Sequence, residues 1–271
     1  MARRSKKGDK KLLLRWIFAL GSVLLVMTAL AIFLKNRPEP TPLPTTAPTL
    51  EPNPYGPADF GYTEDGYLTC LSGESIPGID VSSHQGTIDW PKVKAAGIEF
   101  AFIRVGYRGY DTGTLHADQT ALTNLHQAKA AGVKIGAYFF SQALNETEAV
   151  EEASFALAML DGITLDLPLV YDWEYVSESV RTGAMKPDTL LACVEAFCAQ
   201  VEQAGFSPMV YFNRELSSTL LDLIQVSRYP FWLAMYTDQM DFPHRVDFWQ
   251  YSDKGNVPGI DGDVDLDLYF P

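Results

Sequence analysis

The sequence is poor in the residues that build metal centres and disulfide frameworks. Its three cysteines, Cys70, Cys193 and Cys198, follow neither a metal-binding spacing nor an obvious disulfide pattern. Cys193 and Cys198 fall in a helical stretch, where we expect buried small hydrophobes, and a disulfide from Cys70 to one of them stays an open alternative. The four histidines form no H-x-x-x-H pair, which argues against a zinc site. We therefore predict no metal and no cofactor.

Basic side chains are scarce beyond the first 37 residues. Residues 1–37 carry nine Lys and Arg and one acid, whereas the rest carries 12 basic and 33 acidic residues, a formal charge of about −21. Such a charge repels nucleic acid and anionic lipid, so neither is an expected partner of the main body. A neutral or cationic polymer stays an option, as does the interpretation that the acidity only aids solubility.

Residues 16–34 contain no charge and no proline. At about 1.5 Å per residue this stretch reaches about 28 Å, enough to cross the hydrocarbon core of a bilayer. Residues 1–15 are rich in Lys and Arg, which keep a short N-terminus cytoplasmic. We expect a single-pass anchor in the cell membrane with a basic cytoplasmic tail and an extracellular domain. The alternative is secretion after signal cleavage near Ala29 to Ala31, although the apolar run continues to Leu34.

A proline-rich stretch follows the predicted transmembrane helix. Between Pro38 and Pro57, proline alternates with Thr, Glu and Ala, with almost no apolar periodicity. Such a composition cannot bury a core, so residues 35–58 are predicted to form an extended, semi-rigid linker. Residues 59–75 fit neither this linker nor the pattern after it, and no function is assigned to them. The folded domain is predicted over residues 76–271.

From residue 76 onward, short apolar runs alternate with helical ones. Strands are predicted at Gly78–Val81, Phe100–Val105, Lys134–Phe140, Leu167–Glu174, Met209–Phe212, Phe231–Ala234, Phe248–Tyr251 and Val264–Leu268. Helices are predicted at Trp90–Ala96, Thr120–Ala131, Thr147–Leu160, Pro187–Ala204 and 213–224. This rhythm indicates an α/β fold, a closed TIM-like barrel with five βα units followed by three strands. A doubly wound open sheet is the alternative, but no G-x-G-x-x-G follows the first strand.

Two carboxylates stand where the fourth predicted strand ends. Strand side chains alternate, so Asp172 and Glu174 share one face, while Tyr171 and Trp173 point the other way. Burying two unpaired acids together is costly and raises at least one pKa, as a general acid near neutral pH requires. The pattern therefore favours glycoside hydrolysis. The alternative is a strand end whose acids cap a helix or pair with basic residues.

Other acids are predicted at the same rim. In a barrel of this class the chemistry lies at the C-terminal ends of the strands, and Asp80 ends the first strand. Asp263, Asp265 and Asp267 share a face of the last strand at period two. For Asp263 and Asp267, as for Asp261 in the preceding turn, ordinary acidity of a loop is the favoured interpretation.

Several motifs in order resemble the family 25 glycoside hydrolases, the N-acetylmuramidase lysozymes. They are Gly78-Ile-Asp-Val-Ser-Ser-His-Gln-Gly86, Phe102-Ile-Arg104, Gly136-Ala-Tyr-Phe-Phe140, Asp172-Trp-Glu174, Phe248-Trp-Gln-Tyr-Ser252 and Val264-Asp-Leu266, within a likeness that spans Ile76 to Phe270. The resemblance implies the barrel described above. It also implies hydrolysis of the β-1,4 bond between N-acetylmuramic acid and N-acetylglucosamine in peptidoglycan glycan strands. One departure is Asp267, where the family often has Asn.

The resemblance also implies roles for single residues. Glu174 is the expected general acid for the leaving oxygen. Asp172 would stabilise positive charge on the sugar or orient the substrate's 2-acetamido group, and the sequence does not choose between these mechanisms. Asp80 and Asp265 would tune and position that pair.

Four aromatic residues are candidates for stacking on sugar rings: Tyr138, Tyr211, Trp232 and Trp249. Core packing explains each of them equally well. Two other functions stay open. A non-catalytic peptidoglycan-binding module would keep the aromatics and lose the acid, and the presence of Glu174 weighs against it. A metal-dependent carbohydrate hydrolase or deacetylase could instead use Asp80, Asp172, Glu174 and Asp265 as oxygen ligands.

Overall fold

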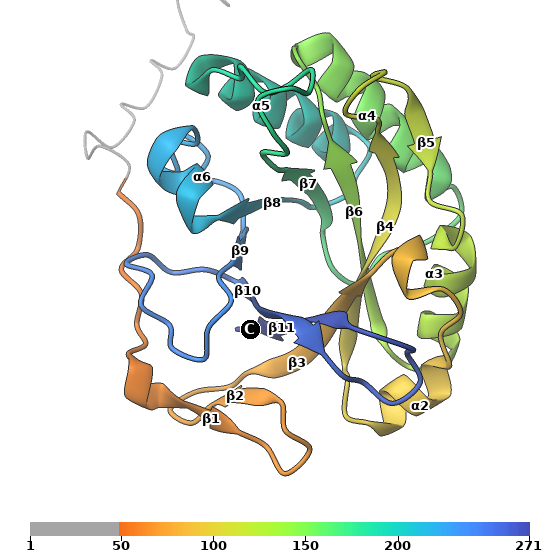
Figure 1. Cartoon of the computed structure of the whole chain (residues 1–271), viewed down its shortest axis with the longest axis vertical. Helices are drawn as coiled ribbons and strands as arrows, with labels where there is room; N and C mark the ends of the chain where they lie inside the picture. The colour runs from red at the N-terminus through yellow and green to blue at the C-terminus, as the bar shows by residue number, and fades with distance from the viewer. Residues whose placement is uncertain (1–48) are drawn as a thin grey trace, which may run out of the picture. The chain divides into compact units, whose positions relative to one another are not determined.

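The computed structural model describes residues 49–271 and contains an eight-stranded closed barrel (Figure 1). The strand order around the barrel is β3-β11-β10-β9-β8-β7-β6-β4, and pairing between β3 and β4 closes it. This confirms the predicted mixed α/β barrel. The strands are β3 (Ile76–Val81), β4 (Phe100–Arg108), β6 (Lys134–Ser141), β7 (Leu169–Trp173), β8 (Pro208–Asn213), β9 (Phe231–Ala234), β10 (Phe248–Gly255) and β11 (Val264–Tyr269).

A helix follows each of the strands β3, β4, β6, β7 and β8. These helices are α2 (Trp90–Ala95), α3 (Ala121–Ala130), α4 (Glu146–Met159), α5 (Pro187–Gln203) and α6 (Arg214–Thr219). The side chains of Asp89, Asn145 and Asn213 each accept a backbone N–H at the start of a helix. Helix α6 is shorter than predicted, because the segment from Leu220 onward leaves the helical conformation. A short strand that was not predicted, β5 (Leu115–Ala117), pairs with the end of β4.

The last strand runs against its neighbours. β11 pairs antiparallel with both β10 and β3, whereas the other barrel strands pair in parallel. The beginning of β11 therefore lies at the rim where β3 ends, and Asp265 stands directly opposite Asp80. The prediction placed the acids of β11 at this rim, and the antiparallel direction explains why they lie at the start of their strand.

The barrel interior is filled by large side chains. One buried cluster comprises Phe100, Phe102, Tyr138, Val170, Met209, Tyr211, Trp232, Ala234 and Phe248. Two glycines make room for it. A Cβ atom at Gly78 would lie 2.3 Å from the Phe100 ring, and one at Gly136 would lie 2.4 Å from Phe102. The barrel is thus a packed core, and chemistry is confined to its ends.

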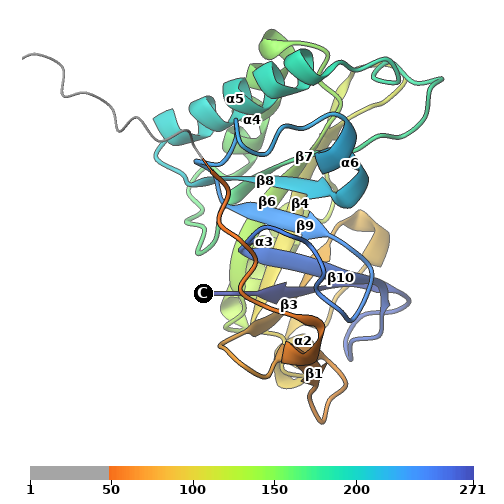
Figure 2. The same cartoon turned by 90° about the vertical axis from the view of Figure 1, so that its left-hand side faces the viewer.

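The strands without helices are covered by the chain that precedes the barrel. In Figure 2 the segment from residue 49 passes across the outer side of β8, β9 and β10. Tyr55 stacks on Phe270 at 4.9 Å, and Phe60 packs edge-on against Trp249 at 5.2 Å. A hairpin of β1 (Phe60–Tyr62) and β2 (Leu68–Cys70) follows.

Contacts also join the chain before the barrel to the loop between β9 and β10. Asn53 donates from Nδ2 to the carbonyl of Phe242 at 2.9 Å, and Pro52 pairs with His244. Residues 49–58, predicted as linker, therefore pack against the barrel. Residues 59–75, left unassigned, cover apolar barrel surface that would otherwise face water. The apolar surface that residues 59–75 bury therefore contributes to the free energy of unfolding.

Some predictions fall on residues that the structure does not describe. The basic tail (1–15), the transmembrane anchor (16–34) and the linker up to residue 48 lie outside the described residues. Within residues 49–271, no helix is both long enough and apolar enough to span a bilayer. Cys70, Cys193 and Cys198 are buried free thiols in the structure, which therefore contains no disulfide from Cys70 to Cys193 or Cys198.

Candidate active site

The end of β7 carries the two acids at the centre of the sequence interpretation. Asp172 is buried in this strand, and Glu174 follows its last residue, Trp173. The predicted alternation is present, since Val170 belongs to the interior cluster while Tyr171 and Trp173 belong to the outer one. Asp172 therefore points into the barrel.

Three further acids converge on the same rim. Asp80 from β3 is 5% exposed, and Asp265 from β11 lies directly opposite it. Asp267, two residues along β11, is completely buried. The interpretation of Asp267 as ordinary loop acidity is therefore wrong, because Asp267 lies within β11 and its side chain bonds to Trp232 inside the barrel. Asp261 and Asp263 are exposed.

Polar side chains from neighbouring strands hold some of these carboxylates. Gln250 donates from Nε2 to Asp80 Oδ2 at 2.7 Å, and its Oε1 accepts from the Tyr211 hydroxyl at 3.0 Å. Trp232 donates from Nε1 to Asp267 Oδ1 at 2.8 Å. Gln250 lies in the Phe248–Ser252 motif and Asp267 in the last predicted strand, but the sequence assigned neither of them a role in the site.

Other carboxylate oxygens at the rim are buried without such donors. Asp172 Oδ1 and Asp267 Oδ2 find no hydrogen-bond partner among residues 49–271. An unsatisfied buried polar atom is costly and is usually kept only where it has a function. The Oδ1 atom of Asp172 thus has no donor in the described part of the chain that satisfies its charge.

The electrostatics of the rim favour protonated acids. Burial, with a contribution from the Asp265 carboxylate, raises the pKa of Glu174 to about 7. Burial, with a contribution from Asp253, raises the pKa of Asp265 to about 6. Burial and then the charge of Glu174 raise the pKa of Asp172 well above its ordinary value. Glu174 can therefore hold and release a proton near neutral pH.

One cation opposes this trend. Arg104, in the middle of β4, lowers the pKa of Asp172 by its charge, although burial dominates. Its Nε donates to Asp118 Oδ2 at 3.0 Å, and its Nη2 donates to Ser83 Oγ at 3.3 Å. Arg104 thus favours an ionised Asp172 beside a protonated Glu174, which is the division of labour that a glycosidase needs.

Comparisons with known proteins agree with this geometry. The model of the family described as glycosyl hydrolases family 25 matches residues 79–260. The chain belongs to glycosyl hydrolases family 25. It is 31% identical over 200 residues to the autolytic lysozyme of Clostridium acetobutylicum, covering 72% of this chain and 56% of that protein. It is 29% identical to lysozyme M1 of Streptomyces globisporus, covering 72% and 67%.

Solved structures show the same fold. The modular autolysin LytC of Streptococcus pneumoniae, solved with a synthetic peptidoglycan ligand, aligns with a TM-score of 0.67 and 25% identity. The alignment covers 78% of this chain and 52% of LytC. This family 25 chain thus spans about half the length of LytC and of the Clostridium acetobutylicum lysozyme.

The predicted sugar-stacking aromatics occupy different places in this family 25 barrel. Tyr138 and Tyr211 lie beside the acids, 8% and 5% exposed. Trp232 is 1% exposed and stacks on Phe102 inside the barrel. Trp249 is fully buried outside the barrel wall and donates to the Met235 carbonyl at 2.8 Å. Neither tryptophan offers a face to a sugar, which corrects the stacking prediction for both.

An exposed aromatic at the rim was missed. Tyr236 follows β9, is 56% exposed, and its hydroxyl lies 3.3 Å from Gln250 Oε1. Its pKa is raised, first by burial of its hydroxyl and then by the charges of Asp265 and Glu174. A lone tyrosine in a loop carries no periodic signal, so only the folded chain places it beside the acids.

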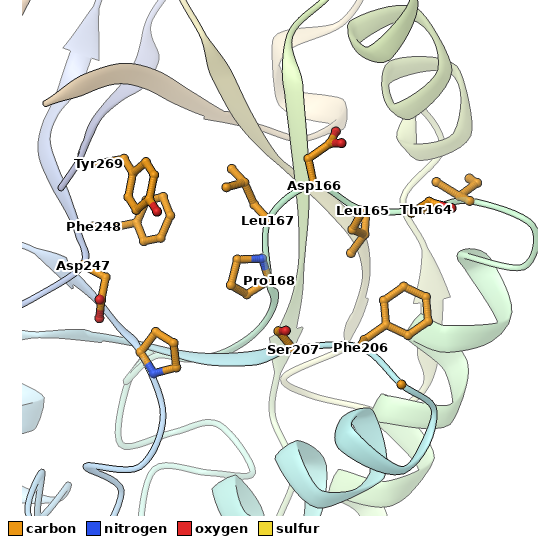
Figure 3. A pocket seen from close by; sticks show the side chains of 13 residues that line it. Thr164, Leu165, Asp166, Leu167, Pro168, Phe206, Ser207, Asp247, Phe248 and Tyr269 are labelled. Carbon is orange, nitrogen blue, oxygen red and sulfur yellow. The ribbon is translucent and has the colours of Figure 1, made fainter. Parts of the chain in front are cut away.

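The opposite end of the barrel holds a cavity of about 500 Å³ (Figure 3). Leu167, Pro168, Phe248 and Tyr269 line it together with Asp166 and Asp247. It lies at the N-terminal ends of the strands, away from the acids. Within residues 49–271, no group of three or more His, Cys, Asp or Glu side chains has the arrangement of a metal site.

Proposed function

We propose that this protein is a peptidoglycan hydrolase that cleaves the β-1,4 bond between N-acetylmuramic acid and N-acetylglucosamine. The observation that carries the proposal is the half-buried Glu174, whose pKa is raised to about 7, next to Asp172 at the rim of a family 25 barrel. Relatives described as lysozymes and an autolysin support the choice of substrate. The acidic surface is compatible with a glycan and repels nucleic acid.

The reaction follows from the placement of the two acids. Glu174 donates its proton to the glycosidic oxygen as the bond from that oxygen to C1 breaks. Positive charge develops on the sugar ring, and Asp172, whose charged form Arg104 favours, stabilises it or orients the 2-acetamido group for internal attack. Water then supplies hydroxide to C1 and returns a proton to Glu174. Asp80 and Asp265 position the pair and adjust its charge.

A product analysis tests the proposal directly. The folded unit, residues 48–271, is incubated with purified peptidoglycan, and the new reducing ends are reduced with borohydride and identified by mass spectrometry. Reduced muramic acid supports a muramidase, whereas reduced glucosamine ends indicate a glucosaminidase. Binding without new ends indicates a non-catalytic module. Loss of activity with a chelator, restored by a divalent metal, indicates the metal-dependent alternative.

We also propose that residues 16–34 anchor the protein in the cell membrane, with residues 1–15 in the cytoplasm and the barrel outside. The support is the uncharged length of the span and the basic residues before it. Added protease should then digest the barrel in cells stripped of their outer layers. Protection of the barrel contradicts this topology, and a mature N-terminus near Ile32 indicates secretion after cleavage. Tethering favours remodelling of nearby wall.

A further inference from the structure

Glu174 stands just beyond the hydrogen-bonded part of its strand. The pairing of β7 with β6 ends at Trp173, opposite Ser141, and its pairing with β8 ends at Asp172. The main chain of Glu174 therefore lies where the sheet no longer holds it. A general acid that must protonate one oxygen needs a defined position, since small displacements reduce the rate strongly.

The side chain of Gln142 supplies the missing hydrogen bond. Gln142 follows β6, is fully buried, and donates from Nε2 to the Glu174 carbonyl at 3.1 Å. The carbonyl can only accept, so the amide must present its NH₂ group to it. The amide oxygen then faces Thr182, whose hydroxyl donates to it. Thr182 is 1% exposed and lies in the segment between β7 and α5.

The main chain of Gln142 is itself held from two sides. Its N–H donates to Glu152 Oε1 at 3.2 Å, and its carbonyl accepts from Arg181 Nη1 at 2.8 Å. Glu152 is fully buried and paired with Arg108 at 2.7 Å. Arg181 is in turn paired with Glu148 at 2.7 Å. These contacts make Gln142 a rigid support, because the peptide groups before and after it are both hydrogen-bonded to ion-paired side chains.

We infer that Gln142 is a positioning residue for Glu174 and that Thr182 sets the orientation of the Gln142 amide. This inference rests on the proposed function, since it gives Glu174 the role of general acid. It gives the segment between β7 and α5 a part in catalysis, although this segment lies outside the Asp172-Trp-Glu174 motif.

The test compares variants of the full chain on peptidoglycan. Gln142→Met keeps the length of the side chain but loses both hydrogen bonds, and kcat should fall by about 10- to 100-fold while KM changes little. Thr182→Val removes only the hydroxyl and should lower kcat by about 3- to 10-fold. Thr182→Ser keeps the hydroxyl and should recover most of that loss. Thr219→Val is the matched control, because this exposed threonine bonds only to the Glu215 carbonyl of its own helix.

The results separate this inference from the proposed function. If the wild-type chain releases no reducing ends, both are overturned. If the wild type is active and Glu174→Gln is not, but Gln142→Met and Thr182→Val keep wild-type kcat and lose only melting temperature, the inference alone is overturned. If Gln142→Met does not fold, the pair Thr182→Val and Thr182→Ser decides, since equal kcat values for the two contradict it.

Discussion

Both ends of the barrel carry carboxylates among apolar side chains, but the hydrogen-bond partners of these carboxylates differ. At the N-terminal end, Asp166 Oδ2 accepts the N–H of Ile135 at 3.1 Å and Asp247 Oδ2 accepts the N–H of Phe231 at 2.9 Å. At the C-terminal end, Asp172 Oδ1 is buried with no partner among the described residues. Backbone N–H groups thus satisfy the carboxylates at the N-terminal end, whereas Asp172 Oδ1 at the C-terminal end lies in an apolar environment without a donor from residues 49–271.

The difference separates a structural acid from a chemical one. Backbone donors favour the ionised carboxylate and tie strand ends together, which is useful for the fold and unsuited to proton transfer. Burial near like charges favours the protonated form, which destabilises the rim at neutral pH but keeps a proton ready for donation. Residue type alone does not distinguish the two ends. Burial and hydrogen-bond partners do, because Asp166 is exposed and Asp247 half-buried, whereas Asp172 is buried.

The largest effect is expected from replacing the acid that donates the proton. Glu174→Gln should keep the fold and lower the hydrolysis rate by about 10²- to 10⁴-fold, because an amide of the same shape has no proton to give. Asp247→Asn, the same change at the opposite end, should alter the rate by about twofold or less. Release of reducing ends from peptidoglycan measures both. Activity of Glu174→Gln above a third of wild type contradicts the assignment.

A smaller loss is expected at the acids beside Glu174. Asp80→Asn and Asp172→Asn should each lower the rate by about 10²-fold, because each removes a carboxyl group that can carry negative charge beside the oxocarbenium-like transition state. Asp261→Asn is the matched control, since Asp261 is exposed in the turn before β11. Wild-type rates for the first two variants would show that glycan is cut elsewhere.

Stability should respond to pH at the C-terminal end of the barrel. The pKa of Glu174 is raised from 4.5 to about 7, so its contribution to stability is present below 4.5 and lost as pH rises through 7. Glu174→Gln removes this dependence. The free energy of unfolding of the variant should therefore rise relative to that of the wild type, a gain of up to about 3 kcal/mol between pH 4 and 8. Urea unfolding of both proteins measures the gain. A difference that does not change with pH contradicts it.

The charge of Asp265 should be visible in the pH profile of the rate. Asp265 contributes to the raised pKa of Glu174, after burial. Asp265→Asn removes that charge, so the pKa of Glu174 falls and the alkaline limb of kcat moves to lower pH. The rate of peptidoglycan hydrolysis between pH 4 and 9 measures the shift. An alkaline limb that stays in place, or moves up, would remove Asp265 from the electrostatics of the acid.

The smallest effect is expected from the exposed aromatic at the rim. Tyr236→Ala should raise KM by about 3- to 10-fold with little change in kcat, because stacking on a sugar contributes about 0.5–1.5 kcal/mol to binding. Tyr236→Phe keeps the ring and loses only the contact with Gln250. Equal KM values for Tyr236→Ala and wild type would show that the ring contacts no sugar.

Much of the barrel follows from local patterns in the chain. All eight predicted barrel strands are present, and β9 has the predicted bounds. Strand alternation places Asp172 inward and Trp173 outward, because its period of two depends only on neighbouring residues. For the same reason the motifs around Asp80 and Glu174 locate the rim of the site.

The sequence by itself therefore determined the barrel, the order of its elements and the acids at the ends of β3 and β7. Only the tertiary structure decided that Asp267 faces inward, that Trp249 is buried and that residues 49–75 cover the helix-free wall. It also joined Gln142 to Thr182, 40 residues apart in the chain. The physical reason is that these features depend on strand direction, barrel closure and contacts between distant segments, which leave no periodic pattern in the sequence.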